Sequence, residues 1–579
     1  MAKKMTEDQV RDKARDILGL ADKEGVQAGV GQITTFNQLG FTGVLDKPDG
    51  WYLPENPMET AVVLETKAEN TPLGDKHISE LLKNVEIVES KYKNVIGILY
   101  NGEKTKVYKG SDKESGEYLD SGAGTLQNVE YYTSLYVTEN VDKEYIYDIT
   151  AKINNCLHSK FKIENLYHRM IFTACALVAK RYNALMTKGM SYSVFQNSIK
   201  EQLEAELADD ENRNSKLKIL IEVFSEIKMG LNVNSTSKSE QEKIKKLIYE
   251  FIGWVTEISE CINSDTWRGE DVMGIFFNEF NRYKGKPTDG QVFTPEHITD
   301  FMYKILEVNQ HDRVLDATCG SGGFLVKSMA NMIAEAGGVK TDRAKEIKAH
   351  QLFGIEFSRE IYALACANML IHKDGKTNLE QMDARSAEAG VWIGKHGITK
   401  VLMNPPFETQ FGCMEIVENV LNNVSRGTVC GFILPDKKLE KTNNKPQIER
   451  ILEHHRLRKI VKLPEDLFFG LGVTTSIFIF EAGIPQNGEE IFACWMQEDG
   501  LQTVKNKGRH DVYGHWLDIE ERWVGVVRKQ SGDDTCQWID PSEALSYQVP
   551  KSLLRSLRKI FARRLWTMFY LSEELMLKN

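Results

Sequence analysis

Two short segments in the second half of the chain constrain its fold more than any other feature. Residues 314–324, VLDATCGSGGF, read as a buried strand that runs into a glycine-rich turn. Residues 400–407, KVLMNPPF, read as another strand that ends in a proline-stiffened polar loop. In an open α/β sheet, ligands bind at the carboxyl ends of the strands, where such turns lie side by side. We therefore expect the two turns to form one site.

The glycine-rich turn suits a nucleotide-like cofactor. Gly320, Gly322 and Gly323 let the backbone turn tightly and approach a ligand, and the following helix points free amides at it. The next strand ends in Glu356, where a carboxylate accepts both ribose hydroxyls, and the strand after it ends in Asp383, placed to accept from an adenine amino group. Each acid alone is equally consistent with a helix cap. Two such acids at the ends of successive strands favour the interpretation that they bind a cofactor.

A Thr-Pro pair stands just upstream of this turn. Thr294 is a good N-cap and Pro295 suits the first position of a helix, so a cap alone explains the pair. In the functional interpretation, their loop closes over the methionine end of a cofactor.

The NPPF loop suits an exocyclic amine of a nucleobase. Such a nitrogen is a poor nucleophile because its lone pair is delocalised into the ring. The side-chain oxygen of Asn404 and the carbonyl of Pro405 can hold its two hydrogens and favour in-line attack on a sulfonium methyl. Phe407 can stack on a base that has left the duplex. A rigid structural loop is the alternative, but the order of the two motifs argues against chance.

Taken in order, these segments resemble the γ-class amino-methyltransferases, in which the donor motif precedes NPPF or NPPY and GQxxTP stands just ahead. Residues 251–482 resemble most closely the modification subunit of type I restriction systems. The resemblance implies N6-adenine methylation of double-stranded DNA with a flipped adenine, and S-adenosylmethionine as cofactor. It implies a cofactor site of Thr294, Pro295, Asp316, Gly320, Gly322, Glu356 and Asp383. It implies a catalytic loop of Asn404, Pro405, Pro406 and Phe407.

One rival exists among methyltransferases. Protein-glutamine methyltransferases use NPPY on the same fold. Phe407 in the fourth position and the segment GQVFTP favour the DNA enzymes.

The amino-terminal region carries candidate residues for a second chemistry. Asp49 stands near one expected strand, and Glu65 and Lys67 end the next, in a pattern that resembles the PD-(D/E)xK nuclease core. Phosphodiester cleavage needs Mg²⁺ on hard oxygen ligands, and Asp49 and Glu65 would supply them. Lys67 would orient the attacking water. Asp46 is the reserve candidate for the aspartate role.

A Glu-x-Lys triplet alone is weak evidence in so charged a chain. It recurs in helical stretches at residues 89–91, 226–228 and 346–348. The triplet at 65–67 differs because it ends an apolar strand after a PDG turn, with a helix and a strand following. An inactive relic or a surface salt bridge is the alternative.

Changes of pattern along the 579 residues predict four regions, in line with ~100–200 residues per domain. Residues 1–120 predict a small mixed α/β nuclease-like domain, with strands expected at residues 41–46, 60–67, 94–102 and 104–110. Residues 121–285 predict a helical domain. Residues 286–485 alternate apolar runs with helical periods, which indicates a doubly wound sheet. Residues 486–579 are mixed, and residues 551–564 predict a basic amphipathic helix that docks on a partner, with direct phosphate contact as the alternative. The expected fold class is α/β, with a Rossmann-like methyltransferase sheet.

Composition excludes several classes of protein. No apolar run approaches the ~20 residues of a membrane helix and no signal region opens the chain, so we expect a cytoplasmic protein without a membrane partner. The nine cysteines form no CxxC pair, which argues against a disulfide framework and a zinc site. A net charge of -10 gives no support to DNA binding by bulk electrostatics, although basic residues can gather locally.

The combination of regions resembles the fused restriction-modification polypeptides of types IIB, IIC and IIG. We expect a protein that methylates DNA and cleaves unmodified DNA. About 95 residues follow the methyltransferase region, too few for a target-recognition domain, so we expect a separate specificity subunit or a truncated chain. The alternatives are a DNA adenine methyltransferase whose amino-terminal domain is inactive or only binds DNA, and a catalytically silent scaffold.

Overall fold

The computed structural model describes residues 4–549, apart from residues 21–25, 32, 56, 58, 93, 112–125, 130, 134–142, 208–210, 234, 236, 264–271, 281–293, 340, 373–377, 408–411, 466, 469–472 and 505–507. The basic segment 551–564 and the first four residues of GQVFTP therefore lie outside the described residues. One compact unit comprises residues 1–164, 175–205 and 228–268, and a second comprises residues 165–174, 206–227 and 269–579.

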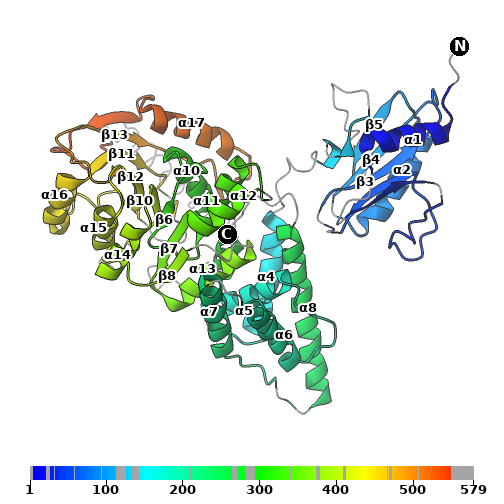
Figure 1. Ribbon diagram of the computed structural model, residues 1–579, viewed down its shortest axis with the longest axis horizontal. Coiled ribbons are helices and arrows are strands. Elements are labelled where there is room, and N and C mark those ends of the chain that lie inside the picture. Colours follow the sequence, from blue (N-terminus) through cyan, green and yellow to red (C-terminus); the bar gives the residue numbers. More distant parts are fainter. Residues whose placement is uncertain are drawn as a thin grey trace, which may run out of the picture. The chain divides into compact units, whose positions relative to one another are not determined.

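A five-stranded sheet forms the amino-terminal part of the first unit (Figure 1). Its strands follow the order β1-β2-β3-β4-β5, and only β3 and β4 run parallel. The strands are β1 (Val26–Val30), β2 (Gly50–Pro54), β3 (Ala61–Thr66), β4 (Val95–Tyr100) and β5 (Thr105–Lys109). Two helices accompany them, α1 (Glu7–Leu18) and α2 (Asp75–Glu89).

Strand β3 is the centre of this domain, because both of its faces are buried. Val62 and Leu64 pack with α1 in one hydrophobic cluster, whereas Ala61 and Val63 pack with α2 in another. The alternation follows from the two-residue period of a strand, and it explains why AVVLET reads as an unbroken apolar run.

One expected strand of this domain is wrong. Residues 41–46, FTGVLD, form turns instead, and Phe41 is buried beside Phe36. Gly43 inside the segment has φ +84°, a left-handed conformation that no extended strand adopts.

Helices α4 (Lys143–Ser159), α6 (Tyr192–Ala205) and α8 (Lys238–Asn263) pack together in the first unit. Phe161 and Phe195 place their rings 6.3 and 5.9 Å from that of Phe251 on α8. In the second unit, α7 (Glu211–Glu226) and α9 (Val272–Phe280) contact α13 (Arg359–Ile371). Helix α5 (Leu166–Arg181) contributes residues to both units.

A nine-stranded sheet forms the centre of the second unit, in the order β16-β13-β11-β12-β10-β9-β6-β7-β8. Strands β6 (Val314–Asp316), β7 (Leu352–Glu356), β8 (Asn378–Gln381), β9 (Lys400–Met403) and β10 (Val429–Pro435) are parallel. The remainder are β11 (Arg456–Lys462), β12 (Thr475–Glu481), β13 (Ile491–Trp495) and β16 (Cys536–Ile539). This architecture confirms the expected α/β fold class, but β12 and β16 are antiparallel to their neighbours, so the sheet is mixed. A separate short ribbon pairs β14 (Gln502–Val504) with β15 (Gly508–His510).

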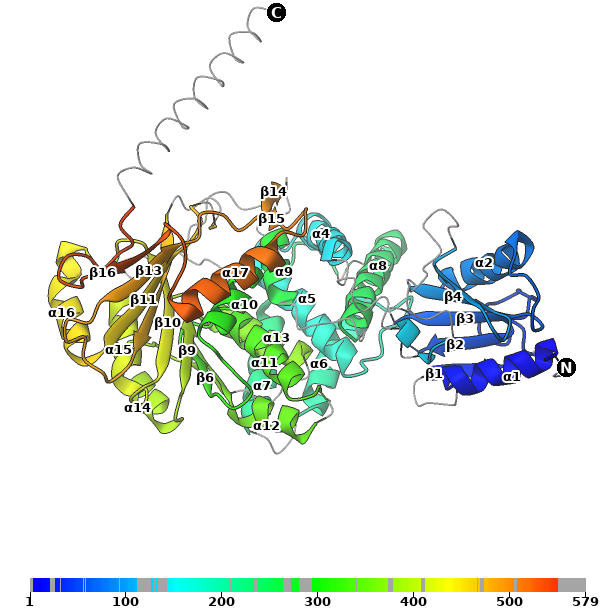
Figure 2. The ribbon, with the colours of Figure 1, turned by 90° about the horizontal axis from the view of Figure 1, so that it is seen from above.

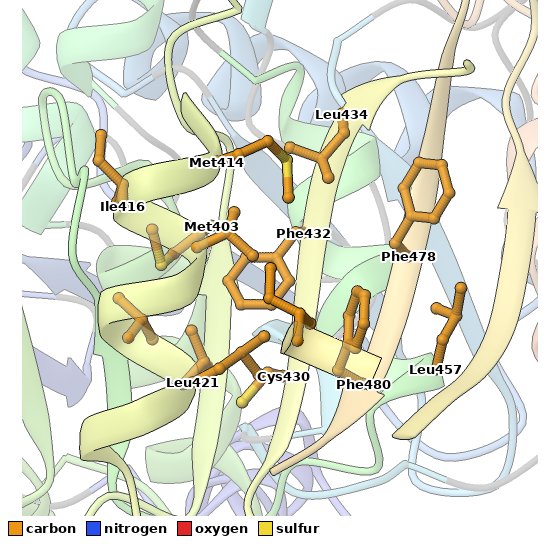
Figure 3. Close-up of a cluster of buried hydrophobic side chains, with 14 of the residues drawn as sticks. Met403, Met414, Ile416, Leu421, Cys430, Phe432, Leu434, Leu457, Phe478 and Phe480 are labelled. Atoms are coloured by element: carbon orange, nitrogen blue, oxygen red, sulfur yellow. The ribbon is translucent and has the colours of Figure 1, made fainter. Parts of the chain in front are cut away.

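Helices cover both faces of this sheet (Figure 2). One face carries α10 (Glu296–Ile305), α11 (Gly323–Glu335), α12 (Asp342–His350) and α17 (Trp516–Lys529). The other carries α14 (Ala387–Lys395), α15 (Cys413–Asn423) and α16 (Lys445–His454). Met403 and Phe432 of the sheet lie against Leu421 of α15 in this second layer (Figure 3). Among the described residues, no helix combines the length and apolarity that a membrane crossing requires.

A substitution of Gly354 in β7 would test how tightly the strands and helices pack around this position. A Cβ there would lie 2.6 Å from Leu379 and 2.9 Å from Leu325. We expect Gly354→Ala to lower the free energy of unfolding by about 1–3 kcal/mol, the usual cost of overpacking. The control Gly525→Ala on α17 meets nothing within 4 Å and should be neutral or stabilising by up to ~1 kcal/mol. Equal thermal unfolding midpoints for the two variants would contradict this packing.

Candidate active site

The parallel strands β6, β7, β8 and β9 end at one edge of the sheet, and a pocket opens there. Of the residues predicted from the two motifs, those that line it are Thr294, Asp316, Gly320, Glu356, Asp383, Asn404, Pro405, Pro406 and Phe407. Pro295 and Gly322 do not line it. Gly322 instead begins α11 with φ +89°. Residues that are nearly a hundred positions apart in sequence thus meet because parallel strands share a carboxyl edge.

The donor turn leaves space for a ligand beside its backbone. Gly320 has φ +56°, and a Cβ on it would meet nothing within 4 Å on the pocket side. Ser321, which also lines the pocket, buries its hydroxyl oxygen without a hydrogen-bond partner among the described residues. An open cradle and an orphaned buried hydroxyl fit a polar cofactor bound against this turn.

Two buried carboxylates stand behind the turn. Glu356 accepts hydrogen bonds from the amides of Gly320 (3.1 Å) and Ser358 (2.9 Å), and Asp316 accepts from the amide of Thr318 (3.0 Å). Burial raises the pKa of Glu356 to about 7. Burial, with the nearby charge of Glu356, raises that of Asp316 to about 8. A ligand that donates hydrogen bonds, such as a ribose, would stabilise the ionised forms.

Asp383 differs from these two acids because it already forms an ion pair within the chain. The guanidinium of Arg385 donates to both of its carboxylate oxygens, at 2.6–3.1 Å, and this pairing lowers the pKa of Asp383. Each carboxylate oxygen has two lone pairs, so acceptor capacity remains for an adenine amino group. Sequence reasoning missed Arg385, although it stands in the same QMDAR segment.

The structure corrects the role of the Thr-Pro pair as a helix cap. Helix α10 begins at Glu296, Pro295 is its N-cap residue, and no side chain caps it. The hydroxyl of Thr294 instead accepts a hydrogen bond from the side-chain amide of Asn404, at 3.0 Å. Thr294 therefore joins the α10 loop to the NPPF loop.

The NPPF loop is fixed by residues that the motif does not contain. Lys438, only 4% exposed, donates to the carbonyl oxygen of Phe407 at 3.1 Å. The ring of Phe407 meets that of Phe468 edge-on, with centroids 5.9 Å apart. Lys438 and Phe468 follow later strands, and no local pattern predicts contacts over such separations. Packed against Lys438 and Phe468 in this way, the four residues of the NPPF loop line the pocket.

The amino-terminal candidates also come together. Asp49 directly precedes β2, Glu65 lies in β3, and Lys67 follows it with its Nζ 3.8 Å from Glu65 Oε2. Burial, then the charge of Asp49, raises the pKa of Glu65 to about 7. The reserve candidate Asp46 pairs with Lys83 at 2.7 Å instead.

Residues that sequence reasoning missed also contact this cluster, and the amide and the hydroxyl of Thr66 each donate to Asp49 at 2.8 Å. Arg11 of α1 donates to Asp49 at 3.1 Å, Asn84 of α2 donates to Glu65 at 2.6 Å, and Glu80 of α2 lies 3.3 Å from the ammonium of Lys67. No group of three or more His, Cys, Asp or Glu residues suited to a metal occurs in the described part of the chain. Mg²⁺ commonly binds through one or two carboxylates plus water, so Asp49 and Glu65 fit it as a minimal pair.

The second unit is a Rossmann-like α/β domain with a pocket at the carboxyl ends of its parallel strands, and comparisons with known proteins show what this domain is similar to. Residues 269–424 and 414–511 match the family model described as N-6 DNA Methylase. A solved chain from a study of the type I R-M system shares the fold, with a TM-score of 0.51 and 16% identity over 76% of this chain and 98% of that one.

Two curated relatives specify the similarity further. The type II restriction enzyme and methyltransferase RM.BcgI of Heyndrickxia coagulans is 31% identical over 306 residues, 49% of this chain and 47% of that protein. The type I restriction enzyme EcoEI methylase subunit of Escherichia coli is 25% identical over 218 residues, 34% of this chain and 43% of that protein. The chain thus spans about half the length of the curated relatives it matches.

Glu356 predicts a pH dependence of cofactor binding. Its pKa of about 7 means that the carboxyl is mostly protonated at pH 6 and mostly ionised at pH 8. Because ribose hydroxyls bind the ionised form, affinity for S-adenosylmethionine should rise about tenfold over this interval, with proton release. Calorimetry at both pH values measures this affinity and the proton release. Glu356→Gln should bind weakly, and its pH dependence should shrink to what Asp316 and the ligand contribute. A pH dependence as large as that of the wild type would refute the role of Glu356.

Proposed function

We propose that the chain transfers a methyl group from S-adenosylmethionine to the N6 amino group of adenine in double-stranded DNA. The observation that carries this proposal is that the donor turn and the NPPF loop line one pocket. When bound, the cofactor supplies an electrophilic sulfonium methyl. The match to the N-6 DNA Methylase model and the Phe at the fourth motif position support adenine over a protein glutamine.

On the cofactor side, the proposed roles follow the strands. Glu356 binds the ribose hydroxyls, Asp383 binds the adenine amino group, and Gly320 lets the ligand approach the backbone. Asp316 stabilises the donor turn, because its carboxylate accepts a hydrogen bond from the Thr318 amide. Thr294 holds Asn404 from the side of α10.

On the acceptor side, Asn404 and Pro405 contact the amino group that receives the methyl. The side-chain oxygen of Asn404 and the carbonyl of Pro405 accept hydrogen bonds from the amino group, which localises its lone pair toward the methyl. Pro406 restricts the loop, and Phe407 stacks on the flipped adenine. Lys438 is a positioning residue, since it acts through the carbonyl of Phe407.

A second activity, cleavage of unmodified DNA, is proposed for the amino-terminal cluster. Asp49 and Glu65 would hold Mg²⁺, which polarises a phosphate, and Lys67 would orient the attacking water. The gathering of these three side chains supports the proposal, and RM.BcgI is named as both restriction enzyme and methyltransferase. The pairing of Asp49 with Arg11 favours the alternative, a methyltransferase with an inactive amino-terminal domain.

A separate specificity subunit is the proposed partner. Several relatives are named as methylase subunits of type I enzymes, and such subunits are parts of larger assemblies.

Asn404→Ala tests the acceptor site. We expect transfer of labelled methyl groups to unmodified plasmid DNA to fall by at least ~100-fold, because one transition-state hydrogen bond is lost. Calorimetry should give a dissociation constant for S-adenosylmethionine within a few-fold of wild type. Asn197→Ala, exposed on α6 and outside the pocket, is the control. Undiminished transfer by Asn404→Ala would exclude the assignment.

Lys67→Ala tests the second activity on the same plasmid with Mg²⁺. We expect cleavage to be lost while methyl transfer persists, because the two clusters share no residue. Lys91→Ala is the matched control, since Lys91 belongs to a Glu-x-Lys triplet beside α2 with no carboxylate pair. If the wild type never cleaves, with or without co-purifying subunits, the methyltransferase-only alternative stands.

A further inference from the structure

The segment of residues 436–445, which joins β10 to α16, lies beside the NPPF loop. Lys438 within it donates to the Phe407 carbonyl at 3.1 Å. Leu439 packs in the same hydrophobic cluster as Met414 of α15, and Figure 3 shows Met414 near Leu434 at the end of β10. Burial raises the pKa of the Cys413 thiol to about 11, and the charges of Lys438 and Lys441 oppose this shift, so both lysines lie near the start of α15.

The two acids of this segment, the buried Asp436 and the exposed Glu440, are engaged by groups outside the segment. Asp436 accepts from the Ser476 hydroxyl at 2.7 Å and pairs with the buried ammonium of Lys462 at 3.3 Å. Glu440 accepts from the Leu545 amide at 3.0 Å and from a serine hydroxyl beside it. Neither acid is therefore directed at the lysines of its own segment.

The remaining lysines face solvent. Lys437, Lys441 and Lys445 are exposed, and none lies within ion-pair distance of a carboxylate in the part of the chain that the structure describes. Thr442 and Asn443 between them are exposed as well and can donate hydrogen bonds. In a chain whose net charge is -10, this is a local excess of positive charge beside the pocket.

We propose that Lys437, Lys441 and Lys445 bind the DNA phosphate backbone next to the nucleotide whose base enters the pocket. The inference rests on the proposed function and names the surface that the DNA strand contacts. Phosphate contacts set the position of a duplex on a protein. A flipped base costs a few kcal/mol of unstacking, so contacts on the adjoining backbone stabilise the flipped state. Lys438 connects this surface to the NPPF loop, because it belongs to the same segment as the exposed lysines and donates to the carbonyl oxygen of Phe407.

An acidic protein partner is the competing occupant. The neighbouring NPPF loop favours DNA, since the backbone of a flipped nucleotide must pass close to the loop that holds its base. The two occupants differ in salt dependence, because binding to phosphates releases condensed counterions in proportion to the number of contacts.

The test combines Lys437→Gln, Lys441→Gln and Lys445→Gln in the full chain, purified with any subunit that accompanies it. The matched control is Lys218→Gln, Lys395→Gln and Lys529→Gln, which removes the same charge from α7, α14 and α17. Methyl transfer to unmodified plasmid at several salt concentrations gives the KM for DNA. We expect KM to rise at least ~10-fold and the slope of log KM against log salt to fall by ~0.9 per lost contact. Calorimetry should give an unchanged affinity for S-adenosylmethionine.

Three outcomes would overturn the inference. A KM and salt slope equal to those of the control triple would remove this surface while leaving the methyltransferase function intact. Loss of a co-purifying subunit with an unchanged salt slope would assign the surface to a protein partner. If wild type transfers no label to DNA although it binds the cofactor, the proposed function fails, and this inference fails with it.

Discussion

The hydrogen bond from the Gly320 amide to the Glu356 carboxylate holds together the part of the structure on which the site depends. It ties the end of β7 to the turn after β6, and it fixes a backbone that only glycine adopts readily, with φ +56° at Gly320. Burial raises the pKa of this carboxylate to about 7, so a ligand that donates hydrogen bonds would stabilise its ionised form. The pocket is formed around this turn.

A second bond, between Asn404 and Thr294, closes the other side of the same pocket. Its two residues come from the loop after β9 and the loop before α10, which are 110 positions apart. The donor turn and the NPPF loop are thus held by two independent links between neighbouring elements. This arrangement suits the proposed methyl transfer between two ligands that lie side by side, and burial raises the thiol pKa values of Cys319 and Cys413.

Much of this architecture could be predicted because it depends on local pattern. Buried parallel strands read as continuous apolar runs, and the polar residues at their carboxyl ends stood out as motifs. The sequence does not predict strand β1, VQAGV, because Gly and Ala leave it little apolar signal. It predicts a strand at residues 41–46, where the structure has a turn at Gly43. Arg11, Arg385 and Lys438 act through charge pairs and hydrogen bonds that only the folded chain defines. For Arg11 and Lys438 these contacts span 38 and 31 residues.

The central claim is that the pocket methylates an exocyclic amine of DNA, and the identity of the product tests it most directly. Unmodified DNA would be incubated with the chain and S-adenosylmethionine carrying an isotopically labelled methyl group, then digested to nucleosides for mass spectrometry. The account predicts that the label appears in N6-methyladenine. Label in a methylcytosine, or in a protein glutamine with none in DNA, would contradict it.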